Sequence, residues 1–216
     1  NQTETVQAPS ETVASAPSKK GAEQLNSLYQ QATKALFSQR AFSATSYGLS
    51  PEEVGGYYND KVENFSPLSE QQLRASLAKL SAEISELPLS STQQIDLDNQ
   101  QVMASITRYF AGSSQFNIGY IDTWMGLSPF IINQINGPLI SIPRSLQNDH
   151  QIRSEKEALD YLARLGQFGQ VLSSIEEKFL ADANNNWLPP KVTLNGALRY
   201  MNAFIKESPE NNPLAV

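Results

Sequence analysis

Apolar residues recur every three or four positions through most of this chain, and this spacing constrains the fold more than any other feature. Between residues 67 and 87 one such stripe comprises Leu73, Leu77, Leu80, Ile84 and Leu87. Between residues 21 and 37 a second stripe comprises Leu25, Leu28, Tyr29, Ala32, Leu36 and Phe37. This is the period of an α-helix with one buried face. The chain is therefore predicted to consist of helices that pack on one another.

Capping residues mark where several of these helices begin. Ser50, Pro51 and Glu53 predict one start, because serine caps a helix, proline suits its first position and glutamate completes a capping box. Ser69 and Gln72 predict a second box ahead of the stripe between residues 67 and 87. We expect that helix to end before the proline at position 88.

Two longer helices are expected further along the chain. One runs from about residue 92 to residue 111 and is predicted to bury Ile95, Val102, Ile106 and either Tyr109 or Phe110. The other begins with a capping box of Ser154 and Glu157, and its predicted stripe comprises Ala158, Tyr161, Leu162, Leu165, Leu172, Ile175 and Phe179.

The sequence NNNWLPPKVTL, residues 184–194, predicts a stiff corner between two helices. Asparagines tolerate the left-handed backbone that ends a helix. We expect Trp187 and Leu188 to pack back as an anchor, Pro189 to hold the residue before it extended, and Pro190 to lie in the first turn of a new helix. That helix would carry Leu194, Leu198, Met201 and Ile205 on one side.

Residues 113–149 differ from the rest, since they are rich in Gly, Pro, Asn and Ile and poor in charge. A long apolar segment of this kind is costly to leave in water, so we expect it to pack inside or to line a groove. The sequence GLSP at 126–129 repeats that at 48–51 and predicts another helix start. The best candidate for a strand is PLISIP, residues 138–143, and it is short.

The predicted fold class is all-α, a multi-helix array with a long irregular apolar segment. Residues 1–20 contain mostly Ser, Thr, Ala, Pro and Gln. They have too little to bury to offset their ordering entropy, so we expect a flexible tether, the alternative being an ordinary ragged terminus. Residues 21–216 would form one helical domain.

Composition excludes several classes of function. The chain has no cysteine and one histidine, which excludes thiolate catalysis and cysteine-bound metal and argues against a zinc site. Its net charge of −6 argues against a nucleic-acid partner. We expect no metal ligand and no catalytic residue in this chain.

The candidates for lining a cleft are Tyr120, Trp124, Asn133, Gln134 and Arg144. Arg144 could form a buried ion pair or face a substrate cavity, and Trp124 with Tyr120 could form a core cluster or an aromatic wall. His150 precedes a helix start and is predicted to be structural, as are Trp187, Pro189 and Pro190.

The sequence FIINQINGPLISIPRSLQNDHQIRSEKEALDYLARLGQFGQVL, residues 130–172, followed by LPPKV at 188–192, resembles the bacterial family labelled domain of unknown function 885 (DUF885). The resemblance covers about residues 120–216. Its matching features are Asn133-Gln134 with Gly137, Ile142-Pro143, His150, Ile152, the run from Tyr161 to Leu165, and Pro189-Pro190.

The resemblance implies a larger helical fold similar to zinc metallopeptidases. Members carry a motif of the His-Glu-x-x-Pro-Gly-His kind and a later glutamate; this sequence lacks that motif, so no position can inherit its role. It implies that the chain is the N-terminal portion of such a hydrolase, forms one wall of the substrate channel for a peptide, and partners a C-terminal remainder that holds any zinc. The tether resembles that of a lipoprotein, which implies a periplasm-facing location in the cell envelope and membrane contact only through a lipid anchor upstream of Asn1. One alternative is a stand-alone helical binding or scaffold module of the periplasm, and another is a periplasmic domain that binds peptides through the apolar segment.

Overall fold

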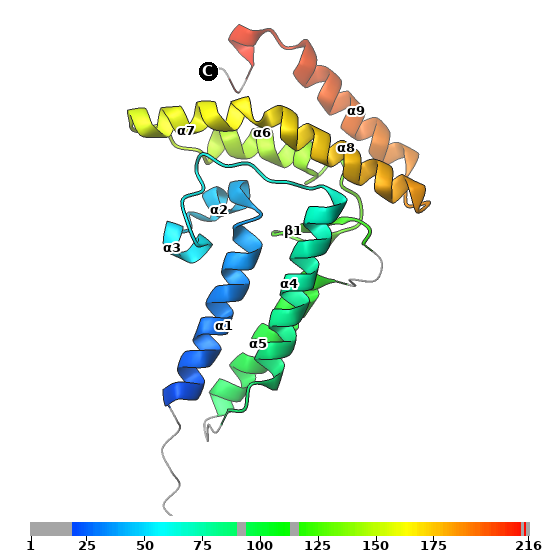
Figure 1. Cartoon of the computed structure of the whole chain (residues 1–216). Helices are drawn as coiled ribbons and strands as arrows, with labels where there is room; N and C mark the ends of the chain where they lie inside the picture. Colours follow the sequence, from blue (N-terminus) through cyan, green and yellow to red (C-terminus); the bar gives the residue numbers. More distant parts are fainter. Residues whose placement is uncertain (1–18, 90–93, 113–116, 213, 215–216) are drawn as a thin grey trace, which may run out of the picture.

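The computed structural model describes residues 19–89, 94–112, 117–212 and 214. Three long helices lie side by side in one half of the molecule (Figure 1): α1 (Lys19–Phe37), α4 (Pro67–Glu86) and α5 (Gln94–Ala111). Four helices lie across one end of this bundle: α6 (Pro138–Asn148), α7 (Glu155–Gly166), α8 (Phe168–Asn184) and α9 (Lys191–Lys206). The short helices α2 (Ala41–Tyr47) and α3 (Pro51–Val54) lie beside the top of α1. The all-α prediction is confirmed.

The described residues contain one small sheet, which the sequence did not predict. Strands β1 (Tyr120–Asp122) and β2 (Gly126–Ser128) pair antiparallel, with Ile121 opposite Leu127. A short 3-10 helix, Pro209–Asn211, follows α9. No helix in the described part of the chain is long and apolar enough to cross a membrane.

The predicted stripes of α1 and α4 form the core of the bundle. Leu36, Leu73 and Leu77 pack with Ala111 and Ile121 in one cluster, and Leu25 packs with Ile84 and Ala104 in another. These stripes are confirmed. The first helix begins at Lys19, two residues before its predicted start, and the rest of the predicted tether, residues 1–18, lies outside the described residues.

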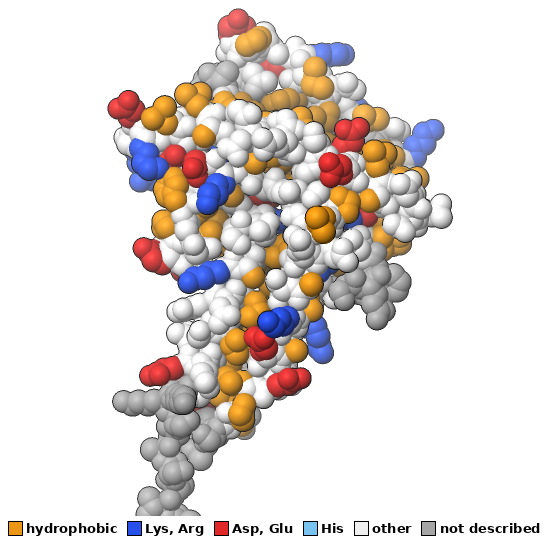
Figure 2. All heavy atoms as spheres, in the orientation of Figure 1, with side chains coloured by type: hydrophobic (Ala, Val, Ile, Leu, Met, Phe, Trp, Pro, Cys, Tyr) orange, Lys and Arg blue, Asp and Glu red, His pale blue; other side chains and the backbone are white. Residues whose placement is uncertain are grey.

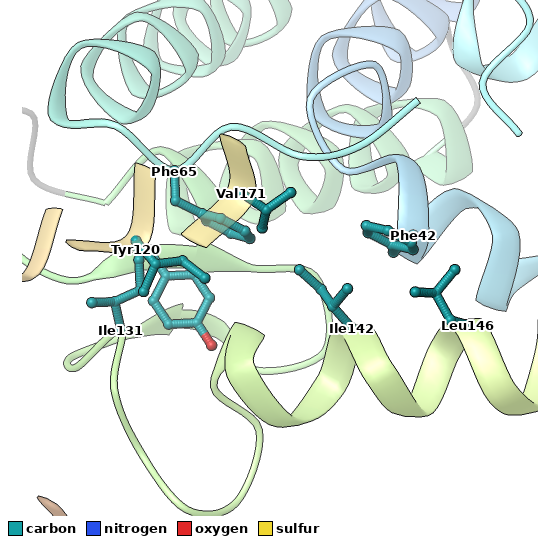
Figure 3. Packing of buried hydrophobic residues seen from close by; sticks show 8 residues of the cluster. Phe42, Phe65, Tyr120, Ile131, Ile142, Leu146 and Val171 are labelled. Atoms are coloured by element: carbon teal, nitrogen blue, oxygen red, sulfur yellow. The ribbon is translucent and has the colours of Figure 1, made fainter. Parts of the chain in front are cut away.

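A second core joins the bundle to the helices above it. Figure 3 shows the Phe65 and Tyr120 side chains lying close together, and shows Ile142 and Leu146 on α6 pointing toward Phe42 of α2. The full cluster comprises Phe42, Phe65, Tyr120, Ile131, Ile142, Leu146, Val171 and Ile175. Because its members come from α2, β1, α6, α8 and the segments between them, this core fixes the hairpin between the two helical layers.

The start predicted for α4 is wrong by three residues. Ser66, rather than Ser69, caps the helix, and its hydroxyl oxygen accepts a hydrogen bond from the Ser69 N–H at 3.4 Å. Pro67 takes the first helical position, which its fixed backbone angle suits. The capping box at Ser50 is confirmed, since Ser50 and Glu53 satisfy each other's backbone N–H groups.

The buried face predicted for α5 is wrong except at Phe110, which packs against the first cluster of the bundle. Ile95, Val102, Ile106 and Tyr109 are exposed by 59%, 53%, 44% and 60%, whereas Ala104, Thr107 and Ala111 are buried. Small side chains on this face allow α5 to approach α4 closely, and the Ser81 hydroxyl of α4 donates to the Ala104 carbonyl oxygen at 2.7 Å. The apolar period was present, but close packing selected the other side of the helix.

The helix predicted from Ser154 is capped as expected but is divided at Gln167 into α7 and α8. Two members of its predicted stripe, Leu162 and Leu172, are exposed by 61% and 38%. The face of α7 that turns inward carries Asp160 and Arg164 instead. A buried polar network, described below, decides this orientation.

The remaining expectations for residues 113–149 are corrected in two places. The sequence GLSP at 126–129 contributes strand β2, so it does not start a helix. The sequence PLISIP lies inside α6, with Pro138 in the first turn and Pro143 within the helix. Its β-branched isoleucines gain burial against the second core, and burial outweighs the weaker preference for a strand.

The corner between α8 and α9 has the predicted left-handed residue at Asn186, where φ is +58°. The Trp187 N–H donates to the Asp182 carbonyl oxygen at 2.9 Å, which closes the end of α8. Pro190 is the residue just before α9 and accepts hydrogen bonds from its first turn. Two residues of the apolar side predicted for α9, Leu198 and Ile205, are exposed by 58% and 72%.

Candidate functional site

A cavity of about 350 Å3 lies where α2, the β-hairpin, residues 135–138 and α6 meet. Its floor is formed by side chains of the second core, including Phe42, Phe65 and Tyr120. Its walls carry Ser43, Ser46, Ser141, Ser145 and Thr123, together with charged residues from both layers. The cavity thus combines an apolar base with many hydroxyl groups.

The hydroxyl groups of the cavity wall are connected by hydrogen bonds. The Ser46 and Ser145 hydroxyls lie 3.0 Å apart, and Ser46 also donates to the Asp149 carboxylate. On the other side the Thr123 hydroxyl donates to Ser43 at 2.8 Å. These contacts tie α2 to α6 and to the hairpin, and they hold the wall in place.

The hairpin turn presents Trp124 at the cavity mouth. The Asp122 carboxylate accepts from the Trp124 N–H at 2.8 Å and also from the Asn136 amide. Trp124 is 70% exposed, whereas Tyr120 is 3% exposed and its hydroxyl donates to the Asn136 carbonyl oxygen at 3.1 Å. Tyr120 is therefore a core residue, whereas Trp124 lies outside the core, so the two do not form one core cluster.

Arg144 lines the cavity from α6 and its side chain is exposed. Within the described part of the chain its guanidinium has no hydrogen bond and no ion pair. Among the described residues Arg144 therefore forms no buried ion pair, which was one of its two alternatives. The structure brings Arg144, Tyr120 and Trp124 to the same cavity.

Asn133 and Gln134 line a second, smaller cavity of about 240 Å3. The Asn133 carboxamide oxygen accepts from the N–H groups of Ile135, Asn136 and Gly137 at 2.9–3.0 Å. Asn133 therefore holds the turn that leads into α6. Gln134 lies against Gly196 of α9, where any side chain larger than hydrogen would overlap it.

Beneath the first cavity lies a buried ion pair that the sequence did not indicate. Arg40 and Glu70 are 2% and 0% exposed and contact each other directly. The Arg40 Nε donates to the Ile121 carbonyl oxygen at 3.0 Å, and Glu70 accepts from the Ile121 N–H at 2.9 Å. The pair thus anchors strand β1, and with it the hairpin, to the helical bundle.

Glu63 is a second buried carboxyl group at the cavity. It is 5% exposed and accepts from the Phe42 and Ser43 N–H groups at 3.2 and 3.4 Å, so it satisfies the first turn of α2. Burial raises the pKa of this carboxyl from 4.5 to about 7, although Arg40 and the two N–H donors oppose the rise.

Comparison with known proteins agrees with this architecture. The family model described as "Bacterial protein of unknown function (DUF885)" matches residues 42–216. The chain belongs to the DUF885 family. No curated protein matches.

One solved structure shows how the DUF885 chain relates to a longer protein. The crystal structure of "the putative lipoprotein from Colwellia psychrerythraea" is 56% identical, with a TM-score of 0.87. The similarity covers 90% of this chain but 33% of that protein. The chain therefore spans about a third of the length of this relative. The likeness supports a lipoprotein-like helical domain of the cell envelope.

Two residues of the family-like segment, His150 and Arg164, meet in a buried network. Arg164 is 0% exposed and donates to the carbonyl oxygens of Lys61, Ala41 and Tyr58 at 3.0–3.2 Å. Its Nη1 lies 3.0 Å from His150 Nδ1, and His150 Nε2 lies 3.1 Å from the Glu157 carbonyl oxygen. Since a guanidinium can only donate, Nδ1 accepts and Nε2 carries the proton. Burial and Arg164 lower the pKa of His150, which keeps the ring neutral.

Sequence reasoning missed the role of Arg164 because a charged residue on a helix is usually solvated. One signal was available, since Asp160 and Arg164 are four residues apart and both lie beside the apolar stripe of α7. The same spacing recurs in α8, where Lys178 and Asp182 are buried and paired.

Trp187 stacks on Phe130 with ring centres 5.7 Å apart, and its Nε1 donates to the Pro129 carbonyl oxygen at 2.7 Å.

The described residues do not fit a zinc site. Among them, no three His, Cys, Asp or Glu side chains gather in a way that could hold a metal ion. His150, the single histidine of the chain, uses both ring nitrogens in contacts with protein atoms. Any zinc chemistry of the family would have to come from residues other than these.

Proposed function

We propose that this DUF885 chain is the helical N-terminal portion of a periplasm-facing lipoprotein of a zinc-dependent, peptidase-like kind. In this proposal the hairpin cavity forms part of one wall of the channel that receives a peptide substrate. The observation that carries it is the exposed Arg144 guanidinium, which lines a partly apolar cavity and forms no hydrogen bond or ion pair in the described structure. Clefts that combine apolar walls with a few placed polar groups are the usual sites for small ligands.

The chain would supply binding surface and not the reacting groups. Its hydroxyl groups, Trp124 and Arg144 can hold and orient a ligand, but the described residues fit no metal. The likeness to a longer protein, of which this chain matches 33%, supports a division in which further polypeptide carries the chemistry.

The surface of α7 and α9 supports the same proposal. Leu159 and Leu162 of α7 and Val192, Leu198 and Ile205 of α9 are exposed by 58–72%. Within α9 the buried residue is Ala197. We propose that the C-terminal remainder of the longer protein covers these apolar residues, since exposed patches of this kind mark interaction surfaces.

Peptide hydrolysis by the full natural protein that contains this chain tests the proposal. We expect hydrolysis that a metal chelator abolishes and zinc restores, and we expect Arg144→Ala to lower kcat/KM about tenfold. The matched control is Arg108→Ala, which removes an exposed arginine on α5, outside the cavity. If the full protein hydrolyses no peptide with or without zinc, the stand-alone binding or scaffold module becomes the better account.

A further inference from the structure

The charged residues that line the hairpin cavity differ in whether they already have partners. Arg40 pairs with Glu70, and Asp149 accepts from the Ser46 hydroxyl. Glu63 and Asp122 accept from backbone N–H groups, as described above. Arg144 alone among the charged lining residues has no partner in the described structure. The cavity therefore has one uncommitted charge, and that charge is positive.

A hydroxyl group accompanies this cation on the same side of α6. Ser141 precedes Arg144 by three residues, a spacing that places two side chains next to each other on a helix. Both side chains are exposed and both line the cavity, and the Ser141 hydroxyl has no hydrogen bond in the described structure. A guanidinium beside a free hydroxyl offers several donors to a carboxylate.

Apolar side chains line the same cavity as these donors. Trp124 and Ile135 are exposed by 70% and 67%, and Pro138, the first residue of α6, also lines the cavity. The volume of about 350 Å3 is at the lower end of the range for ligand sites, so it suits the end of a peptide better than an extended chain. Apolar walls beside one cation that has no partner in the described structure select a ligand that is apolar and ends in an anion.

We infer that this cavity binds the C-terminal end of an apolar peptide through its free carboxylate, with Arg144 and Ser141 as the donors. Trp124 and Ile135 would contact the apolar side chains of the last residues. The inference rests on the proposed function, because it names the substrate class of the same cavity. It assigns Arg144 and Ser141 to substrate binding and gives neither of them a part in bond cleavage.

Calorimetric titration of the chain with three small ligands tests the inference. The first is an apolar tripeptide with a free carboxylate, the second is the same peptide with a C-terminal amide, and the third is phenylpropionate, an apolar carboxylate that is not a peptide. We expect the free acid to bind about tenfold or more tightly than the amide at low salt, because a charge-assisted hydrogen bond is lost in the amide. We expect added salt to weaken this preference, since the cation is exposed.

Two variants locate the binding site. Arg144→Ala should bind the acid and the amide equally, and Ser141→Ala should lose part of the preference. Arg108→Ala, which changes an exposed arginine of α5, should keep the full preference. Circular dichroism of each variant checks that the fold is unchanged.

The remaining outcomes separate this inference from the proposed function. If acid and amide bind equally to the unchanged chain, carboxylate recognition is wrong while a peptide-binding wall stands. If phenylpropionate binds as tightly as the peptide acid and with the same dependence on Arg144, the cavity is a site for small carboxylates and the peptide substrate is wrong. If none of the three ligands binds, both the inference and the role of this cavity in the proposed function are overturned.

Discussion

At the scale of single residues, buried charges decide more of this structure than the sequence suggests. Four basic side chains are each at most 2% exposed: Arg40, Arg74, Arg164 and Lys178. Arginine and lysine are seldom buried so fully unless they have partners. Arg164 links the segment after α3 to α7, and Arg40 links the bundle to strand β1. Removing one partner of such a contact leaves an uncompensated charge, which is costlier than losing an exposed ion pair.

Glu63 gives a prediction for stability as a function of pH. Its folded-state pKa of about 7 lies above the ordinary 4.5, so the folded protein holds this proton more tightly than the unfolded chain. The stability that Glu63 contributes is therefore present below pH 4.5 and is lost as the pH rises toward 7. We expect Glu63→Gln, which keeps the oxygen acceptor, to match the unchanged protein near pH 4 and to exceed its free energy of unfolding at pH 8 by up to about 3 kcal/mol.

Urea unfolding at pH 4, 6 and 8 measures this effect. Glu176→Gln is the control, because it neutralises an exposed carboxyl on α8. Parallel pH profiles for Glu63→Gln and the unchanged protein would show that Glu63 does not titrate with a raised pKa.

At the scale of elements, the hairpin is the feature that positions the candidate site, and its geometry depends on glycine. Gly119, just before β1, has φ of +66°, and a Cβ there would overlap the Ser128 carbonyl oxygen. Its N–H donates to Asp182 of α8 at 3.1 Å. The hairpin is therefore bound to the helical bundle through Arg40 and Glu70, and to α8 through Asp182.

Gly119→Ala is expected to lower the free energy of unfolding by about 2 kcal/mol or more, because both the backbone angle and the close carbonyl oppose a side chain. Gly166→Ala is the matched control, since it changes the last residue of α7, where a Cβ would meet nothing within 4 Å. We expect that control to raise the free energy of unfolding by about 0.5–1 kcal/mol. Chemical denaturation measures the free energy of unfolding of both variants. If Gly166→Ala lowers it as much as Gly119→Ala does, the role assigned to Gly119 is wrong.

At the scale of the whole molecule, apolar side chains remain exposed on the layer that contains α7, α8 and α9. Figure 2 shows orange apolar side chains across the upper part of the molecule, where α7 and α8 run. Leu198 and Ile205 of α9 are exposed by 58% and 72%. A helix with this pattern gains its main stabilisation from packing, so it needs a further partner.

We expect the chain of 216 residues on its own to bind a hydrophobic dye and to associate in solution. Replacing both Leu198 and Ile205 by lysine should reduce dye binding and association while changing the free energy of unfolding by less than about 1 kcal/mol. The control is Leu68→Lys, which changes an exposed leucine in the first turn of α4 and leaves α9 unaltered. If the unchanged chain is monodisperse and binds no dye, α7, α8 and α9 need no further polypeptide to pack on them.

The sequence alone determined the all-α class, the stripes of α1 and α4, the cap at Ser50 and the left-handed asparagine at the corner after α8. These features depend on the spacing of apolar residues along the chain and on the backbone preferences of single residues. Both can be read from a short stretch of sequence. The candidate site was predicted only in part: Arg144, Trp124 and Tyr120 meet at one cavity, but nothing in their spacing showed that Ser46, Glu63 or Asp149 would join them.

Tertiary structure decided the rest, for reasons that act over long sequence separations. It selected the small-residue face of α5 for close packing, turned α7 so that Arg164 reaches the backbone near α2 and α3, and placed PLISIP in a helix. It also closed the hairpin over the Arg40–Glu70 pair, whose members lie 30 residues apart from each other and far from Ile121. Burial of whole faces and satisfaction of buried charges outweigh local propensity, and both depend on which distant segments come into contact.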